Sequence, residues 1–360
     1  MDISKIDKNL AVQSSFPEEL SFYDSECEPF KIYGIFREGD KFTRLPGDVA
    51  RTVSNGVSGL APHTAGGRVR FITDSANVAI RAEMKNAGIM PHMAPSGSAG
   101  FDLYTLDESL GETFVSTYQP PTDINKTNAF DSIARLGGKK RRELTIHFPL
   151  YSSVSKLYIG LDPDAYIEAP TPYKNKKPVV YYGSSITQGG CASKPGDIYQ
   201  EVISRRFGLD YINLGFSGNA KAEDSIAEYI SKLDMSIFVY DYDHNAPNPE
   251  HLEATHEKMF LKIRQKNPTL PIILMARPRY VVSEDTEKRL EIIRKTYENA
   301  LARSDGNVYF ITGRELMAIC KNEGSVDGTH PTSLGFYSMG VAVGDVIEKI
   351  LKKNPEITAK

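Results

Sequence analysis

The sequence predicts an α/β protein in two parts: an all-β sandwich or jelly roll, followed by a parallel β-sheet with helices on both faces. Three observations lead to this prediction. The chain has 360 residues, more than one compact core usually needs. The spacing of its apolar residues changes near residue 178 from simple alternation to a strand-and-helix pattern. A segment rich in Pro and Lys, residues 169–178, separates the two patterns.

The first half contains short segments in which apolar and polar residues alternate. They occupy residues 68–75, 77–84, 100–106, 112–119, 143–150 and 156–162. Gly, Pro, Asn and Asp separate them, and we find no convincing amphipathic helix in this half. Short alternating strands at regular spacing are typical of an antiparallel sandwich or jelly roll. We therefore expect a β domain over residues 1–170 and a linker over 171–178.

In the second half, short apolar strands alternate with helical patterns. The expected strands are residues 179–182, 211–214, 236–240, 271–275 and 308–311. The last helix is the clearest, with apolar residues at steps of three and four from Phe336 to Ile350. Strand–helix repetition predicts a parallel sheet over residues 179–360, covered on both faces. Because ligands bind beyond the carboxyl ends of such strands, functional residues should follow each strand directly.

Composition and charge exclude several functional classes. Lys+Arg (43) nearly balance Asp+Glu (46), and no basic stripe indicates a nucleic-acid partner. No apolar stretch is long enough to span a membrane, and the first residues lack the apolar core of a secretory signal. The three cysteines lie far apart without metal-ligand spacing, which is typical of free thiols in a reducing compartment. We expect a cytoplasmic protein. The sequence leaves open whether the protein forms a homo-oligomer.

Polar residues that can take part in reactions follow the predicted strands. In chain order they are Ser184, Ser185, Ser217, Gly218, Asn219, Asp241, Asp243, His244, Asn245, Arg277, Asp327 and His330. A serine hydroxyl becomes a nucleophile when a histidine, itself oriented by a carboxylate, accepts its proton. Asp327 and His330, three positions apart in one loop, can supply that pair. Backbone N–H groups at Ser185 and Gly218 and the Asn245 amide are candidate donors to an oxyanion.

These residues resemble the four sequence blocks of the SGNH or GDSL hydrolases. Residues 183–187, Gly-Ser-Ser-Ile-Thr, are similar to the first block, Gly-Asp-Ser-Leu/Ile-Thr, with Ser184 in place of the aspartate. Gly218 matches the second block, Asn245 the third, and residues 327–330 the final Asp-x-x-His block. The third block departs from the pattern, since Asp243 stands where the family has glycine and Ala246 replaces the closing aspartate.

The resemblance implies a flavodoxin-like parallel sheet and assigns a role to each matching residue. Ser185 is implied as the nucleophile, His330 as the base, and Asp327 as the group that orients His330. The N–H groups of Ser185 and Gly218 and the side chain of Asn245 are implied to form the oxyanion hole. No cofactor is implied.

Residues 100–104, Gly-Phe-Asp-Leu-Tyr, resemble the Gly-x-Asp-Leu-Tyr signature of a β-rich domain that precedes some bacterial SGNH hydrolases. Similar two-domain arrangements occur among carbohydrate esterases that remove acetyl groups from plant polysaccharides. The loops after the strands are small and polar, which suits a sugar better than a fatty chain. The leading hypothesis is therefore a serine esterase that hydrolyses short acyl esters of oligosaccharides, with acetyl as the favoured acyl group.

Several alternatives stay open. Ser184 and Ser185 could cap a helix, Asn245 could cap the helix that follows it, and Asp102 could hold a turn at a strand end. Asp243, His244 and Arg277 are candidates for substrate binding, and an Arg277 salt bridge is the alternative. Asp241, Asp243 and His244 could instead bind a metal together with Asp327 and His330. At the level of function, the alternatives are a lysophospholipase or thioesterase, and a carbohydrate-binding protein with an inactive hydrolase domain.

Overall fold

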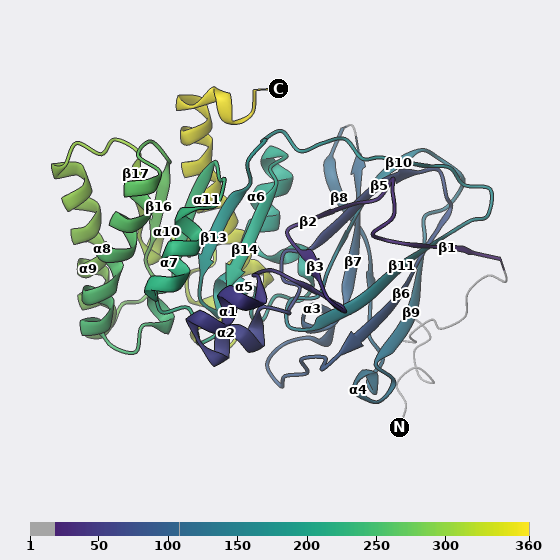
Figure 1. The fold of residues 1–360 in the computed structure, drawn as a ribbon, viewed down its shortest axis with the longest axis horizontal. Helices are drawn as coiled ribbons and strands as arrows, with labels where there is room; N and C mark the ends of the chain where they lie inside the picture. The colour runs from purple at the N-terminus through teal and green to yellow at the C-terminus, as the bar shows by residue number, and fades with distance from the viewer. Residues whose placement is uncertain (1–18, 108, 360) are drawn as a thin grey trace.

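The computed structural model describes residues 19–107 and 109–359, so residues 1–18 of the predicted β domain lie outside the described part. Figure 1 shows a β-rich region formed by the first half of the chain beside a helix-covered sheet formed by the second half. This α/β architecture with a β-rich N-terminal region agrees with the prediction.

The N-terminal region contains two antiparallel sheets packed around one apolar core. The first has the order β1 (Ser21–Asp24), β11 (Ser153–Leu161), β6 (Asn77–Lys85), β9 (Ala129–Arg135). The second has the order β12 (Ile167–Glu168), β5 (Arg68–Thr73), β10 (Arg142–His147), β7 (Phe101–Asp107), β8 (Gly111–Tyr118), and β2 (Lys31–Tyr33) also pairs with β5. Strands β3 (Phe36–Glu38) and β4 (Lys41–Thr43) form a separate hairpin. All six predicted strands are confirmed, whereas the jelly-roll connectivity stays a prediction.

Four short helices in this half were not predicted. Helices α1 (Gly47–Val53) and α2 (Asn55–Leu60) bury Ala50 and Val57 in the same apolar cluster as Leu214 of the second half. Helix α1 has seven residues and α2 has six, so each contains too few apolar residues for a helical period to be recognised in the sequence. Short helices gain most of their stability from tertiary packing, which a sequence pattern does not reveal. The short helices α3 (Pro95–Ser98) and α4 (Ile124–Thr127) were also not predicted.

The second half forms a five-stranded parallel sheet with the order β14 (Tyr211–Gly215), β13 (Val179–Gly183), β15 (Ile237–Asp241), β16 (Ile272–Met275), β17 (Val308–Ile311). This is the 2-1-3-4-5 order of flavodoxin-like sheets. Its helices are α5 (Ser185–Gln188), α6 (Tyr199–Phe207), α7 (Asp224–Ser231), α8 (Pro249–Lys266), α9 (Glu284–Ala302), α10 (Gly313–Leu316) and α11 (Ser333–Lys353). Single 3₁₀ turns lie at η3 (Pro195–Asp197), η4 (Asp243–Asn245), η5 (Lys321–Gly324) and η6 (Pro355–Ile357).

Alternate residues of each strand pack on opposite faces of this sheet. Val180 and Tyr182 belong to the cluster that also contains apolar residues of α7, α8 and α9. Val179 and Tyr181 belong to the cluster that contains residues of α6 and α11. Strand β13 is therefore buried on both sides, as strands of parallel sheets generally are. Within the described ranges, no helix combines the length and hydropathy needed to cross a bilayer.

Candidate active site

The loop after β13 places Ser185 at the first position of α5. Ser184 caps this helix, because its side chain accepts a hydrogen bond from the backbone N–H of Ile186. Ser184 is therefore the structural serine, and Ser185 is left free of the cap. Gly183 lets β13 and β15 approach closely at this point, since a Cβ there would lie 2.1 Å from the carbonyl oxygen of Asp241.

Ser185, His330 and Asp327 form a continuous hydrogen-bonded chain. Ser185 Oγ lies 2.9 Å from His330 Nε2, and His330 Nδ1 lies 2.7 Å from Asp327 Oδ2. These three side chains come from segments 145 residues apart in sequence and meet beyond the end of β13. The geometry allows His330 to accept the Ser185 proton while Asp327 fixes the orientation of the ring.

The loop that carries His330 is a tight turn built around the Asp327 carboxylate. Asp327 Oδ1 accepts hydrogen bonds from the backbone N–H groups of Thr329 (2.9 Å) and His330 (2.8 Å). Burial alone would raise the pKa of Asp327, but the hydrogen bonds from His330 and Thr329 outweigh burial and hold that pKa well below its usual range. The carboxylate is therefore ionised near neutral pH, as a group that stabilises an imidazolium must be.

Residues of the N-terminal region form hydrogen bonds with the turn that carries Ser185. The Tyr151 hydroxyl donates to the backbone oxygen of Ser185 (3.3 Å). Gln188, at the end of α5, donates to the Leu150 carbonyl (3.2 Å) and accepts from the Ser217 N–H (3.0 Å). Gln188 thus connects the turn after β13 to both the loop after β14 and the β-rich region.

The three expected oxyanion donors lie at the ends of neighbouring strands. Gly218, in the turn after β14, has a φ of +68°, a conformation that favours glycine. Asn245 lies in η4 after β15, and its side-chain amide donates to the Phe216 carbonyl at 2.9 Å. The helix-cap alternative for Asn245 is wrong, because Asn248 caps α8 by accepting from the His251 N–H.

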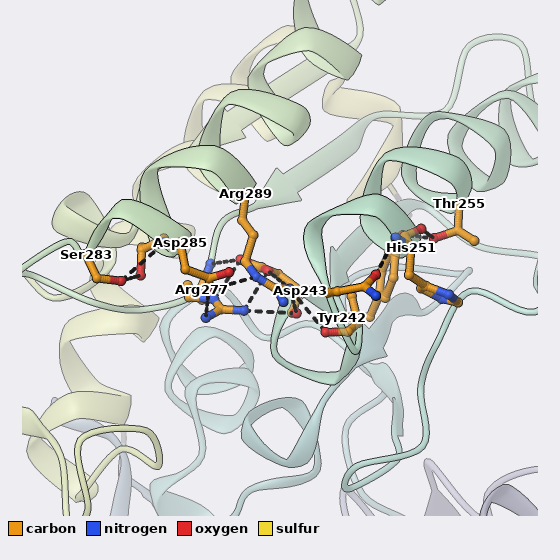
Figure 2. Close-up of polar contacts among 11 residues, drawn as sticks. Tyr242, Asp243, His251, Thr255, Arg277, Ser283, Asp285 and Arg289 are labelled. Carbon is orange, nitrogen blue, oxygen red and sulfur yellow. Dashed lines mark hydrogen bonds and ion pairs between the residues drawn. The ribbon is translucent and has the colours of Figure 1, made fainter.

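Asp243 and Arg277, both expected near substrate, form a buried ion pair beneath the site (Figure 2). Asp243 Oδ1 lies 3.0 Å from Arg277 Nη2 and 3.2 Å from Arg289 Nη1. The Asp243 carboxylate is 1% exposed, so this arrangement favours the salt-bridge alternative for Arg277 and a structural role for Asp243. It also removes Asp243 from the alternative metal-ligand set, since two guanidinium groups occupy its oxygens.

His244 and Asp241 flank this ion pair and differ in their environments. Burial and the charge of Arg277 lower the pKa of His244 well below its usual value, and its buried Nε2 has no hydrogen-bond partner within the described residues. A neutral ring with a free nitrogen suits substrate binding, which stays a prediction for His244. Burial raises the pKa of Asp241 to about 8, and its carboxyl accepts a hydrogen bond from Thr187 Oγ1 at 3.0 Å.

Asp102 of the Gly-x-Asp-Leu-Tyr segment is completely buried where the β-rich region meets the parallel-sheet region. Its carboxylate lies 2.6 Å from His147 Nδ1 and accepts a 2.7 Å hydrogen bond from the backbone N–H of Gly196. His147 Nε2 in turn lies 3.2 Å from Glu201 Oε2 on α6. The segment therefore joins the two regions, which is more than the strand-end role considered from the sequence.

Sequence reasoning missed the residues that reach the site from the N-terminal region. Tyr151 lies in no recognisable motif, and neither does His92, whose ring centroid lies 5.7 Å from that of His330. Both positions depend on the docking of the two regions, and no local pattern in the sequence encodes that contact.

Two family models match the chain. Residues 176–352 match the GDSL-like lipase/acylhydrolase family, and residues 20–167 match the GxDLY family, the N-terminus of SGNH-type esterases. Among curated proteins, no sequence matches this chain.

Three solved structures are similar over nearly their whole length. A protein from Bacteroides ovatus described as a GDSL-like lipase has 29% identity and a TM-score of 0.83, covering 93% of this chain and 98% of its own. A salicylyl-acyltransferase, SsfX3, from a tetracycline biosynthetic pathway has 18% identity and a TM-score of 0.73 at the same coverage. A family two carbohydrate esterase from Cellvibrio japonicus has 9% identity and a TM-score of 0.59, again at 93% and 98%. The last two likenesses concern the fold alone.

Proposed function

Because residues 176–352 belong to the GDSL-like lipase/acylhydrolase family, we propose that this protein is a serine esterase that removes short acyl groups, above all acetyl groups, from oligosaccharides. One observation carries the proposal: the chain of hydrogen bonds from Ser185 through His330 to Asp327, at 2.9 and 2.7 Å. This geometry is the one that acyl transfer through a serine requires.

In the proposed mechanism, Ser185 Oγ attacks the ester carbonyl carbon while its proton moves to His330 Nε2. The N–H groups of Ser185 and Gly218 and the Asn245 amide stabilise the oxyanion that forms. His330 then gives the proton to the departing sugar hydroxyl, leaving an acyl group on Ser185. A water molecule that transfers its proton to His330 releases the carboxylic acid and restores Ser185. No cofactor takes part.

A cavity of about 350 Å³ borders the His330 loop at Gly328, and we assign the sugar to it. Its lining combines the polar residues Arg279, Tyr280, Lys321 and Asn322 with apolar ones, among them Val281, Val282 and Met317. Donors of this kind hydrogen-bond to hydroxyl groups, and tyrosine rings provide a surface for the apolar face of a sugar. The similarity in fold to a family two carbohydrate esterase also supports a carbohydrate ester as the substrate.

The direct experiment measures acetate release from acetylated xylo-, manno- and gluco-oligosaccharides. We expect acetate release by the wild type and an increased KM in Tyr280→Ala, with the rate on p-nitrophenyl acetate unchanged. The lysophospholipase or thioesterase alternative predicts instead that rates on p-nitrophenyl esters rise with chain length from acetate to laurate. A preference for laurate would contradict the acetylesterase proposal.

We also propose a cytoplasmic location, supported by the cysteines. Cys27, Cys191 and Cys320 are all free thiols in the structure, as expected in a reducing compartment. Fractionation of the native host would check this, and recovery in an extracytoplasmic fraction would contradict it.

A further inference from the structure

Three side chains that can bind a metal ion meet beside Ser185. His92 lies between β6 and α3 of the β-rich region, Cys191 follows α5, and His330 is the proposed base. One ligand atom from each lies within 4.8 Å of the other two. Of the three, only His330 takes part in the proposed reaction, so the structure gives His92 and Cys191 no role in hydrolysis.

The donor set matches the preferences of zinc. Imidazole nitrogen and cysteine sulfur are typical zinc ligands, and three protein ligands leave a fourth tetrahedral position for water. Ligand atoms around tetrahedral zinc lie about 3.5 Å apart. The three groups would therefore have to converge by only about 1 Å. The His92 side chain is exposed and can supply much of this movement.

The loops that carry these ligands are held against one another. Ser96, four residues after His92, donates to the Ser193 carbonyl at 2.6 Å. Gly97 of α3 packs so closely on Ala192 that a Cβ would lie 2.1 Å from the Ala192 oxygen. The segment bearing His92 is therefore fixed beside the segment bearing Cys191, and the cluster does not depend on a free loop.

We propose that His92, Cys191 and His330 form a zinc site whose occupancy inhibits the enzyme. Binding of the ion depends only on the three ligands, whereas inhibition rests on the proposed function. Both ring nitrogens of His330 are engaged, Nε2 with Ser185 and Nδ1 with Asp327. Whichever nitrogen binds the ion, one hydrogen bond of the chain is lost and His330 can no longer serve as the base.

The first test titrates zinc against hydrolysis of p-nitrophenyl acetate by the full chain, with Mg²⁺ as a control ion. We expect inhibition by Zn²⁺ and none by Mg²⁺. His92→Ala and Cys191→Ser should keep their activity without zinc and need about tenfold more zinc or higher for half-inhibition. Cys27→Ser, which removes an exposed thiol outside the cluster, should behave as wild type. Equal zinc sensitivity in wild type, His92→Ala and Cys191→Ser would overturn the proposal.

The second test does not depend on catalysis. Co²⁺ bound by a thiolate gives a sulfur-to-cobalt charge-transfer absorption, so the site can be observed spectroscopically in an inactive protein. Ser185→Ala loaded with Co²⁺ should show this band, and Ser185→Ala/Cys191→Ser should not. A missing band in Ser185→Ala refutes the metal site itself. A band without esterase activity in the wild type would instead refute the proposed function and keep the site.

Discussion

The Asp102 carboxylate accepts a 2.7 Å hydrogen bond from the backbone N–H of Gly196, and this bond joins the β-rich region to the parallel-sheet region. The Asp102 carboxylate also contacts His147, with 2.6 Å between Asp102 Oδ1 and His147 Nδ1. Burial alone would lower the pKa of His147, but the charges of Glu201 and Asp102 outweigh it and raise that pKa to about 9. A charged histidine between two carboxylates therefore lies at the centre of the interface.

Asp102→Ala should destabilise the protein by about 3–5 kcal/mol, because it leaves a buried imidazolium with one counter-ion fewer and the Gly196 N–H without an acceptor. Denaturant unfolding measures the loss. Asp131→Ala is a suitable control, since it removes a surface ion pair with Arg81 and should cost less than about 1 kcal/mol. Equal losses in the two variants would mean that the interface network contributes little.

Asp243→Ala should also destabilise the protein by about 3–5 kcal/mol, because Arg277 and Arg289 would each lose a buried carboxylate. If Asp243 is structural, the remaining folded protein should keep the wild-type KM. A variant with wild-type stability and a raised KM would show that Asp243 contacts the substrate instead.

Asp241→Asn should flatten the pH dependence of stability. The pKa of Asp241 is raised from 3.8 to about 8 by burial, so the folded protein holds a proton that the unfolded chain releases. Stability from this group therefore falls as pH rises, by about 1.4 kcal/mol per unit between those values. The amide mimics the protonated acid and carries no such dependence. Thermal unfolding of both proteins from pH 5 to 7.5 measures the difference, and parallel curves would contradict the assignment.

The strands and the polar residues of the candidate site could be predicted because both depend on local sequence. All five parallel strands are where apolar runs indicated, and the side chains that follow them gather at one edge because parallel strands share their carboxyl ends. Ser185 follows β13 directly, whereas His330 lies beyond β17, α10 and η5 and was predicted from its spacing to Asp327. The two side chains meet although 145 positions separate them.

Features that depend on tertiary packing could not be predicted. Helices α1 and α2 are too short for their apolar residues to show a recognisable period, and they pack on residues of the parallel-sheet half. Asp243 and Arg277, which form an ion pair, were candidates for substrate binding because charged residues at strand ends can either bind substrate or form structural salt bridges. Burial distinguishes the two, and burial is a property of the folded chain.

Asn245→Ala should lower kcat by about 10²–10³-fold with little change in KM, because an oxyanion donor acts mainly in the transition state. Asn248→Ala is the matched control. It removes the cap of α8 from the same loop and should reduce stability by about 1 kcal/mol without a comparable loss of kcat. Similar kcat losses in both variants would point to disruption of the loop rather than to a donor role for Asn245.

The most direct test of the account is covalent labelling with a fluorophosphonate probe, followed by peptide mass spectrometry. The account predicts that wild type is labelled on the peptide containing Ser185, that Ser185→Ala is not labelled, and that Asp327→Asn is labelled about 10³-fold or more slowly because His330 loses its orienting carboxylate. Absence of label in wild type, or equal labelling of wild type and Ser185→Ala, would contradict catalysis by Ser185.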